Sequence, residues 1–164
     1  MGEDEFNKIY QLYVKEVFKF LLKLTRNYEL AEEFTQETFV KAFINIDTFK
    51  GNSKLIVWLC QIGKNSYFDY LKYSNRLYSI ENIKDCKSKG SLEDNYIEKN
   101  EAEIIHTLLM QLNEPYKTVF VDRVYLELSY KEIGTQHRKN EGWARVTYYR
   151  AKCMIQKRMG EMIL

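Results

Sequence analysis

Apolar residues recur at helical spacing along almost the whole of this chain, and the chain contains a single proline, Pro115. Residues that return every three or four positions share one face of a helix. No stretch shows the apolar–polar alternation that a half-buried strand requires. The pattern therefore predicts an all-α fold, with helices over residues 6–25, 29–46, 53–74, 97–112, 115–126, 129–137 and 141–162.

Residues 77–95 interrupt this pattern. Their sequence, LYSIENIKDCKSKGSLEDN, is polar and mixed in charge, and it contains Gly90 and three serines. Such a composition is typical of a linker between domains. We therefore predict two small helical domains, over residues 1–76 and 96–164, joined by a flexible linker over residues 77–95.

Positive charge gathers near the C-terminus. The whole chain has 25 Lys and Arg against 23 Asp and Glu, whereas residues 137–158 hold seven basic residues and one acid, Glu141. A concentrated basic segment favours a polyanion such as nucleic acid as its partner. A solvated basic helix is the alternative that charge alone leaves open.

The remaining composition argues against several classes of protein. The three cysteines are far apart, so they predict neither a disulfide framework nor a metal cluster. The first residues, MGEDEFNK, are acidic, and no apolar run approaches the roughly 18 residues of a membrane span. His106 and His137 are isolated, and there is no glycine-rich phosphate loop. We expect a cytoplasmic protein without catalytic residues, metal, cofactor or small-molecule substrate.

Residues 129–152 have the form of a helix-turn-helix. Ser129 and Glu132 have the spacing of a capping box at the start of a short helix. A polar turn, RKNEG, follows, and then a second helix begins. This second helix has an inward stripe and an opposite outward face. The inward stripe is Ala144, Tyr148, Ala151 and Ile155, and the outward face is Val146, Tyr149 and Cys153 flanked by Arg145 and Arg150.

That outward face suits the major groove of DNA. The groove admits one helix, arginine pairs with guanine through two hydrogen bonds, and apolar atoms meet the methyl group of thymine. Arg138, Lys139 and Lys152 are placed to contact phosphates, which give affinity and register but no sequence information.

Two faces in the first domain also need explanation. In residues 53–74 a row opposite the inward stripe contains Trp58, Gln61, Asn65, Phe68 and Lys72. If the row is exposed, it suits single-stranded DNA, because aromatic rings stack on unpaired bases, amides bind base edges and a lysine binds phosphate. The alternative is that the row is buried against the first helix. In residues 29–46 the outer face contains Glu32, Glu33, Gln36, Glu37, Val40 and Ile44. Carboxylates repel phosphate, so this face favours a protein partner over DNA, with a solvated face as the alternative.

Three segments resemble, in this order, motifs of the bacterial sigma factors of RNA polymerase. The segment that docks on the clamp of the β′ subunit is similar to AEEFTQETFVKAF. The segment that melts and reads the −10 promoter element is similar to FKGNSKLIVWLCQIGKNSYFDYLK, and the −35-reading helix-turn-helix is similar to LSYKEIGTQHRKNEGWARVTYYRAK. Two helical domains and a short linker are the layout of the extracytoplasmic-function (ECF) group.

The resemblance implies a region 2-like bundle and a region 4-like helix-turn-helix domain that direct core RNA polymerase, through its β′ clamp and β subunit, to promoter DNA. It also implies a membrane-anchored anti-sigma factor that holds the protein at the inner face of the membrane. The polymerase-binding candidates are Glu33, Gln36, Glu37, Phe39 and Val40. The −10 candidates are Phe49, Gly51, Asn52, Ser53, Lys54, Trp58, Gln61, Asn65, Phe68 and Lys72, and the −35 candidates are Arg138, Lys139, Arg145, Val146, Tyr149, Arg150 and Lys152.

The sequence departs from the family pattern at three positions. Arg138 stands where the turn usually has glycine, Trp143 where a small hydroxyl residue is usual, and Asn52 replaces a frequent aspartate. Two other functions remain as alternatives: a sigma-like decoy that titrates an anti-sigma factor, and a stand-alone helix-turn-helix repressor. A decoy has no need of the basic outward helix face, and a repressor leaves the first 76 residues unexplained.

Overall fold

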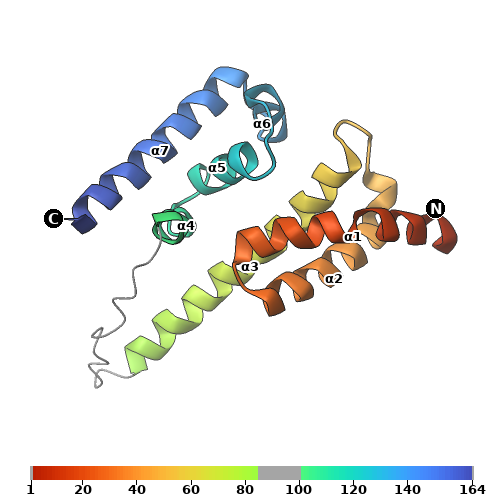
Figure 1. Ribbon diagram of the computed structural model, residues 1–164, viewed down its shortest axis with the longest axis horizontal. Helices are drawn as coiled ribbons and strands as arrows, with labels where there is room; N and C mark the ends of the chain where they lie inside the picture. The colour runs from red at the N-terminus through yellow and green to blue at the C-terminus, as the bar shows by residue number, and fades with distance from the viewer. Residues whose placement is uncertain (1, 85–100, 164) are drawn as a thin grey trace. The chain divides into compact units, whose positions relative to one another are not determined.

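The computed structural model describes residues 2–84 and 101–163 (Figure 1). All regular secondary structure in these two ranges is helical, which confirms the predicted fold class. The chain divides into two compact units, Met1–Gly90 and Ser91–Leu164. No helix in the described part of the chain is both long enough and apolar enough to span a bilayer.

The first unit is a bundle of three helices, α1 (Glu3–Thr25), α2 (Tyr28–Asn45) and α3 (Leu55–Lys84), with a short 3₁₀ turn, η1 (Ile46–Thr48), after α2. Each of the three helices packs against the other two. Their apolar stripes meet in the centre, as the helical spacing requires. The buried core side chains include Val17, Leu21, Leu24, Ala31, Phe34, Ala42 and Leu59.

Local sequence explains the tight α1–α2 turn and the close packing of α3. Arg26 follows α1 with a φ of 52°, and the Oδ1 atom of Asn27 accepts a hydrogen bond from the Leu30 amide at 3.0 Å, which caps α2. Gly63 lies where a Cβ atom would be 2.7 Å from the Oγ1 atom of Thr38. A glycine at this position therefore lets α3 approach α2 closely.

Helix α3 continues to Lys84, so the first eight residues of the predicted linker, 77–84, are helical. This stretch has no glycine or proline, and Leu77, Ile80 and Ile83 keep a helical spacing. The rest of the predicted linker and the first residues of the helix predicted over 97–112 lie outside the described residues.

The second unit contains α4 (Glu101–Met110), α5 (Tyr116–Val124), α6 (Tyr130–Gln136) and α7 (Glu141–Ile163). Helix α7 packs against the other three helices of the unit. Both hydrogen bonds of the predicted capping box are present at the start of α6: Glu132 N donates to Ser129 Oγ at 3.2 Å, and Ser129 N donates to Glu132 Oε2 at 2.8 Å. The core side chains are Leu108, Leu109, Leu112, Val119, Val121, Leu128, Ile133, Ala144, Ala151 and Ile155.

Candidate functional site

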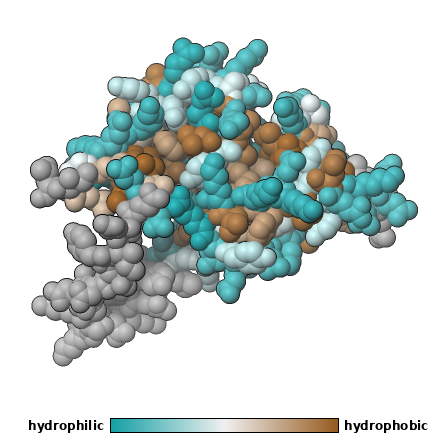
Figure 2. Space-filling model, in the orientation of Figure 1, coloured by the Kyte–Doolittle hydropathy of each residue, from teal (hydrophilic) through white to brown (hydrophobic). Residues whose placement is uncertain are grey.

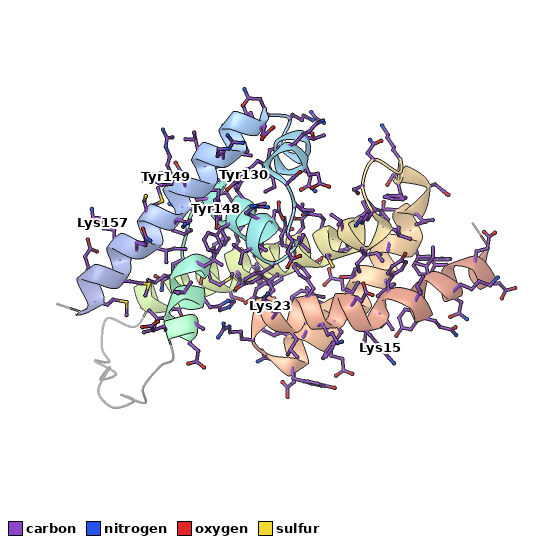
Figure 3. All side chains as sticks on the ribbon, turned by 45° about the horizontal axis from the view of Figure 1, so that its top comes forward. Lys15, Lys23, Tyr130, Tyr148, Tyr149 and Lys157 are labelled. Carbon is purple, nitrogen blue, oxygen red and sulfur yellow. The ribbon has the colours of Figure 1, made fainter. Side chains whose placement is uncertain are left out.

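Helix α7 presents the two faces that its sequence predicts. Ala144, Ala151 and Ile155 are buried, and the half-buried ring of Tyr148 lies 5.5 Å from that of Phe120. On the opposite side Val146 is 49% exposed and Tyr149 is 65% exposed. Arg145, Arg150, Lys152 and Cys153 are also exposed. Figure 3 labels the neighbouring rings of Tyr148 and Tyr149 on this helix.

The turn between α6 and α7 fixes how this face is presented. Arg138 has a φ of 54°, in the left-handed region that glycine adopts most easily, which explains why glycine is usual there. Lys139 N donates to the carbonyl oxygen of Gly134 at 2.8 Å, and Trp143 N donates to Oδ1 of Asn140 at 2.8 Å. The backbone conformation at Arg138 and these two hydrogen bonds hold the turn together. The side chains of Arg138 and Lys139 are exposed beside it.

Trp143 belongs to the packing of this turn. Its ring is half-buried, and its centroid lies 5.1 Å from that of His137, the residue that ends α6. His137 in turn has its Nε2 atom 4.0 Å from Oδ2 of Asp122, which is fully buried on α5. The departure from a small hydroxyl residue at position 143 thus places an aromatic contact between the turn and the start of α7.

Arg145 has partners that the sequence reasoning did not identify. Its Nη2 atom donates to Oε1 of Glu141 at 2.7 Å, and its guanidinium carbon lies 5.4 Å from the ring centroid of Tyr130. The only signal in the sequence was the spacing of four between Glu141 and Arg145, which suits an ion pair along a helix. Lys152 lies on the same helix, with its Nζ atom 5.8 Å from the Tyr148 ring centroid.

In the first unit the predicted row on α3 is exposed in part. Asn65 and Lys72 are exposed, and Trp58 and Gln61 are half-buried. Phe68, in contrast, is only 4% exposed, so at this residue the structure favours burial, the alternative that the sequence left open. Helical spacing gives the direction of a side chain but not what covers it, and removing a phenylalanine ring from water is favourable.

The loop before α3 is anchored by one aromatic contact. Phe49 and Trp58 have ring centroids 5.3 Å apart at an interplanar angle of 46°. Gly51 has a φ of 71° and open space around it, and this conformation favours glycine. Asn52, Ser53 and Lys54 are exposed between these anchored points. The loop therefore offers polar groups and a cation beside a pair of rings.

An apolar groove lies between α1 and α2. Its lining residues are Phe6, Tyr10, Gln36, Phe39, Val40, Phe43 and Ile44. The floor is made of edge-to-face rings, with centroids 5.0 Å apart for Phe6 and Phe43 and 4.8 Å apart for Tyr10 and Phe39. Figure 2 shows apolar atoms reaching the surface near the start of α1 and the end of α2.

Of the five polymerase-binding candidates, Gln36, Phe39 and Val40 line this groove, whereas Glu33 and Glu37 are not among its lining residues. Glu33, Gln36 and Val40 are exposed and Glu37 is half-buried beside Lys41, whereas Phe39 is only 4% exposed and supports the others from below. Sequence reasoning on residues 29–46 missed the contribution of α1, although Phe6 and Tyr10 are one helical turn apart. An exposed apolar patch of this kind marks a protein-binding surface.

Both units of the chain are similar to known proteins. The Sigma-70 region 2 model matches residues 9–77, and the Sigma-70, region 4 model matches residues 102–153. The ECF RNA polymerase sigma factor SigM of Bacillus subtilis (strain 168) is 32% identical over 131 residues, which cover 77% of each chain. RNA polymerase sigma factor YlaC of the same organism is 26% identical over 95% of this chain and 92% of the relative.

A solved structure has the same fold. The sigma factor RpoE of Bartonella quintana, crystallised in complex with the anti-sigma factor NepR, aligns with a TM-score of 0.62 at 18% identity. The alignment covers 93% of this chain and 95% of that one.

Proposed function

Because the chain belongs to the extracytoplasmic-function RNA polymerase sigma factors, we propose that its two units supply three contact surfaces to one transcription initiation complex. The outward face of α7 reads the upstream −35 element, the η1–α3 loop with α3 holds the melted −10 element, and the α1–α2 groove binds core RNA polymerase. Two weak DNA contacts on one chain gain affinity through effective concentration.

The observation that carries the upstream assignment is the composition of the exposed face of α7. Val146 and Tyr149 are exposed without apolar neighbours to cover them, and Arg145 and Arg150 lie at their sides. Apolar atoms between guanidinium groups match the thymine methyl and guanine acceptors of the major groove. Arg138, Lys139 and Lys152 are exposed around this face, in position for phosphates.

The −10 assignment rests on the loop and the exposed part of α3. Phe49 and Trp58 form a tilted ring pair beside the exposed side chains of Asn52 and Lys54. A base extruded from the duplex costs a few kcal/mol, which stacking on a ring and hydrogen bonds to its edge offset. Asn65 and Lys72 continue the polar surface along α3, with the amide for a base and the ammonium for the backbone.

The polymerase assignment rests on the α1–α2 groove. Val40 and Ile44 are 61% and 71% exposed, an unfavourable arrangement in water that contact with a partner protein removes. An anti-sigma factor that covers this groove or the α7 face blocks the same contacts. We propose that this anti-sigma factor is anchored in the membrane, and that the protein becomes active when the anti-sigma factor releases it into the cytoplasm.

Transcription in vitro with purified core polymerase and a promoter library tests the upstream assignment. Start sites that require this protein and share two spaced motifs are expected, and a decoy produces none. Replacing Arg145 or Arg150 with alanine should each cost about 1–3 kcal/mol at a matched promoter, which is a loss of about 5- to 150-fold. Core binding should not change. Equal losses on every DNA sequence would show that the two arginines contact only phosphates.

A matched pair of variants tests the groove. Ile44→Glu places a charge at its rim, and Leu12→Glu makes the same change at a residue of α1 that is 66% exposed and outside the groove lining. Core polymerase should bind the first variant at least about 10-fold more weakly and the second normally, because only the first desolvates a carboxylate on binding. Equal affinities for the two variants contradict the assignment.

A further inference from the structure

The guanidinium group of Arg145 is held from two sides in the absence of DNA. Glu141 accepts its Nη2–H bond at 2.7 Å, with the two side chains 51% and 63% exposed, and the Tyr130 ring lies 5.4 Å from its central carbon. An exposed ion pair of this type stabilises a fold little. Its consequence is instead that one long, flexible side chain has a preferred position.

The ring that supports Arg145 is itself well fixed. Tyr130 is the first residue of α6, directly after the Ser129 capping box, and its ring centroid is 5.9 Å from that of Tyr148. The guanidinium carbon of Arg123 lies 4.8 Å from the same ring, and Arg123 Nη1 donates to the carbonyl oxygen of Leu128 at 2.9 Å. Arg145 therefore contacts a ring whose own position is set by hydrogen bonds and packing.

Glu141 lies in the first turn of α7, where the helix dipole and unpaired amides attract anions. Among residues 137–158 it is the single acid beside seven basic residues. A carboxylate at this place disfavours a phosphate and leaves the remaining N–H groups of Arg145 available. Because the guanidinium of Arg145 cannot easily turn toward the DNA backbone, its remaining N–H groups can donate to the edges of bases.

We infer that Glu141 is a specificity-determining residue of the upstream promoter contact. Its carboxylate holds Arg145 ready for a guanine and keeps phosphates away from that guanidinium. The inference rests on the proposed function, in which Arg145 reads a base of the −35 element. It predicts effects of opposite sign when Glu141 is neutralised: binding to unrelated DNA becomes stronger, while discrimination between the matched and the mismatched element becomes weaker.

The experiment uses the full-length chain bound to core polymerase. The probes are linear promoter duplexes that carry the upstream element selected by the wild-type holoenzyme, the same duplexes with each base pair of that element replaced, and a duplex of unrelated sequence. Glu141→Gln should reduce the discrimination at one guanine position about 3- to 10-fold, the effect of losing one pre-positioned side chain. It should also strengthen binding to the unrelated duplex and steepen the salt dependence by about one phosphate contact.

Two further variants separate position from charge. Glu141→Asp keeps the charge but is one methylene too short for the contact with Arg145, so discrimination should fall as in the glutamine variant. Glu161→Gln makes the same change in net charge at an exposed residue far along α7, and it should leave discrimination unchanged. Wild-type discrimination in Glu141→Asp would overturn the inference, because charge alone would then account for the effect.

The inference and the proposed function fail in different ways. If Arg145→Ala weakens binding to all duplexes equally, Arg145 reads no base and the proposed upstream contact is wrong. If Arg145→Ala removes the preference for guanine while Glu141→Gln keeps it in full, the proposed contact stands and the role of Glu141 is refuted.

Discussion

Replacing Gly134 with alanine should open the turn between α6 and α7. A Cβ atom at this position would lie 2.8 Å from the carbonyl oxygen of Asn140, 2.9 Å from its carbonyl carbon and 2.9 Å from the carbonyl oxygen of Lys139. All three are backbone atoms, which cannot swing aside as the end of a flexible side chain does. Lys139 N also donates to Gly134 O at 2.8 Å, so relief of the clash stretches that hydrogen bond.

The cost follows from this geometry. Inserting a methyl group into a filled space destabilises a protein by about 1–3 kcal/mol, and a clash with backbone alone belongs to the upper half of that range. A change of 1.4 kcal/mol in free energy changes an equilibrium constant about tenfold. Amides that exchange through opening of the second unit should therefore exchange roughly 30- to 150-fold faster. Amides of α1, α2 and α3 should keep their rates, because these helices belong to the other compact unit.

Hydrogen exchange followed by mass spectrometry on the full-length chain measures both units at once. Gly160→Ala is the matched control, because Gly160 is exposed on α7 and a Cβ atom there has open space around it. Alanine should stabilise that helix by about 1 kcal/mol, so the same chemical change has opposite signs at the two glycines. The reasoning is refuted if Gly134→Ala exchanges at wild-type rates, or if both variants change exchange in the same direction.

The remaining predictions concern two buried polar residues, Cys60 and Asp122. Burial, with a smaller contribution from Glu16, raises the pKa of the Cys60 thiol from 9.0 to about 12. Iodoacetamide at pH 8 should therefore modify the exposed Cys153 and leave the buried Cys60 intact until the protein is denatured, which mass spectrometry measures. Since the unfolded thiol ionises near pH 9 and the folded one near 12, Cys60 should lower the free energy of unfolding by about 1.4 kcal/mol per pH unit between these values. The difference in slope between the wild type and Cys60→Ala in urea titrations measures this contribution, because the slope from Tyr67, whose pKa burial also raises, is present in both. For the buried Asp122 beside His137, His137→Phe alone should destabilise the protein, because it leaves the buried carboxylate without this neighbour, and adding Asp122→Leu should recover part of the loss in urea unfolding. A double variant no more stable than His137→Phe contradicts this.

Much of the second unit was predictable because its determinants are local. The Ser129–Glu132 capping box needs only a spacing of three residues, and both of its hydrogen bonds are present. The inward direction of Ala144 and Ala151 follows from helical period alone, and both are buried. The glycine that is usual at position 138 also has a local explanation, since the backbone of Arg138 adopts the left-handed conformation that glycine adopts most easily.

The surfaces that need two helices were harder to predict. The α1–α2 groove joins Phe6 and Tyr10 to Phe43, residues that are far apart in the sequence and meet only once the bundle has formed. The burial of Phe68 has the same origin, because periodicity gives an angle around one helix and does not say which angles its neighbours cover. Helix α3 also extends beyond its predicted end at residue 74, because the polar residues that follow contain no glycine or proline to break the helix before Lys84.

The candidate residues that are exposed can be tested for binding without loss of stability, whereas the buried ones cannot. Val40, Ile44 and Tyr149 are exposed apolar side chains that add little to the folded state, so their presence is best explained by what binds them. Phe39 and Phe68 are each only 4% exposed and contribute to the core, so their replacement lowers stability whatever else it does. A loss of polymerase or DNA binding therefore identifies a contact residue only where the free energy of unfolding stays the same. This condition is met by variants on the rim of the groove and on the outward face of α7, and not by variants of the rings beneath them.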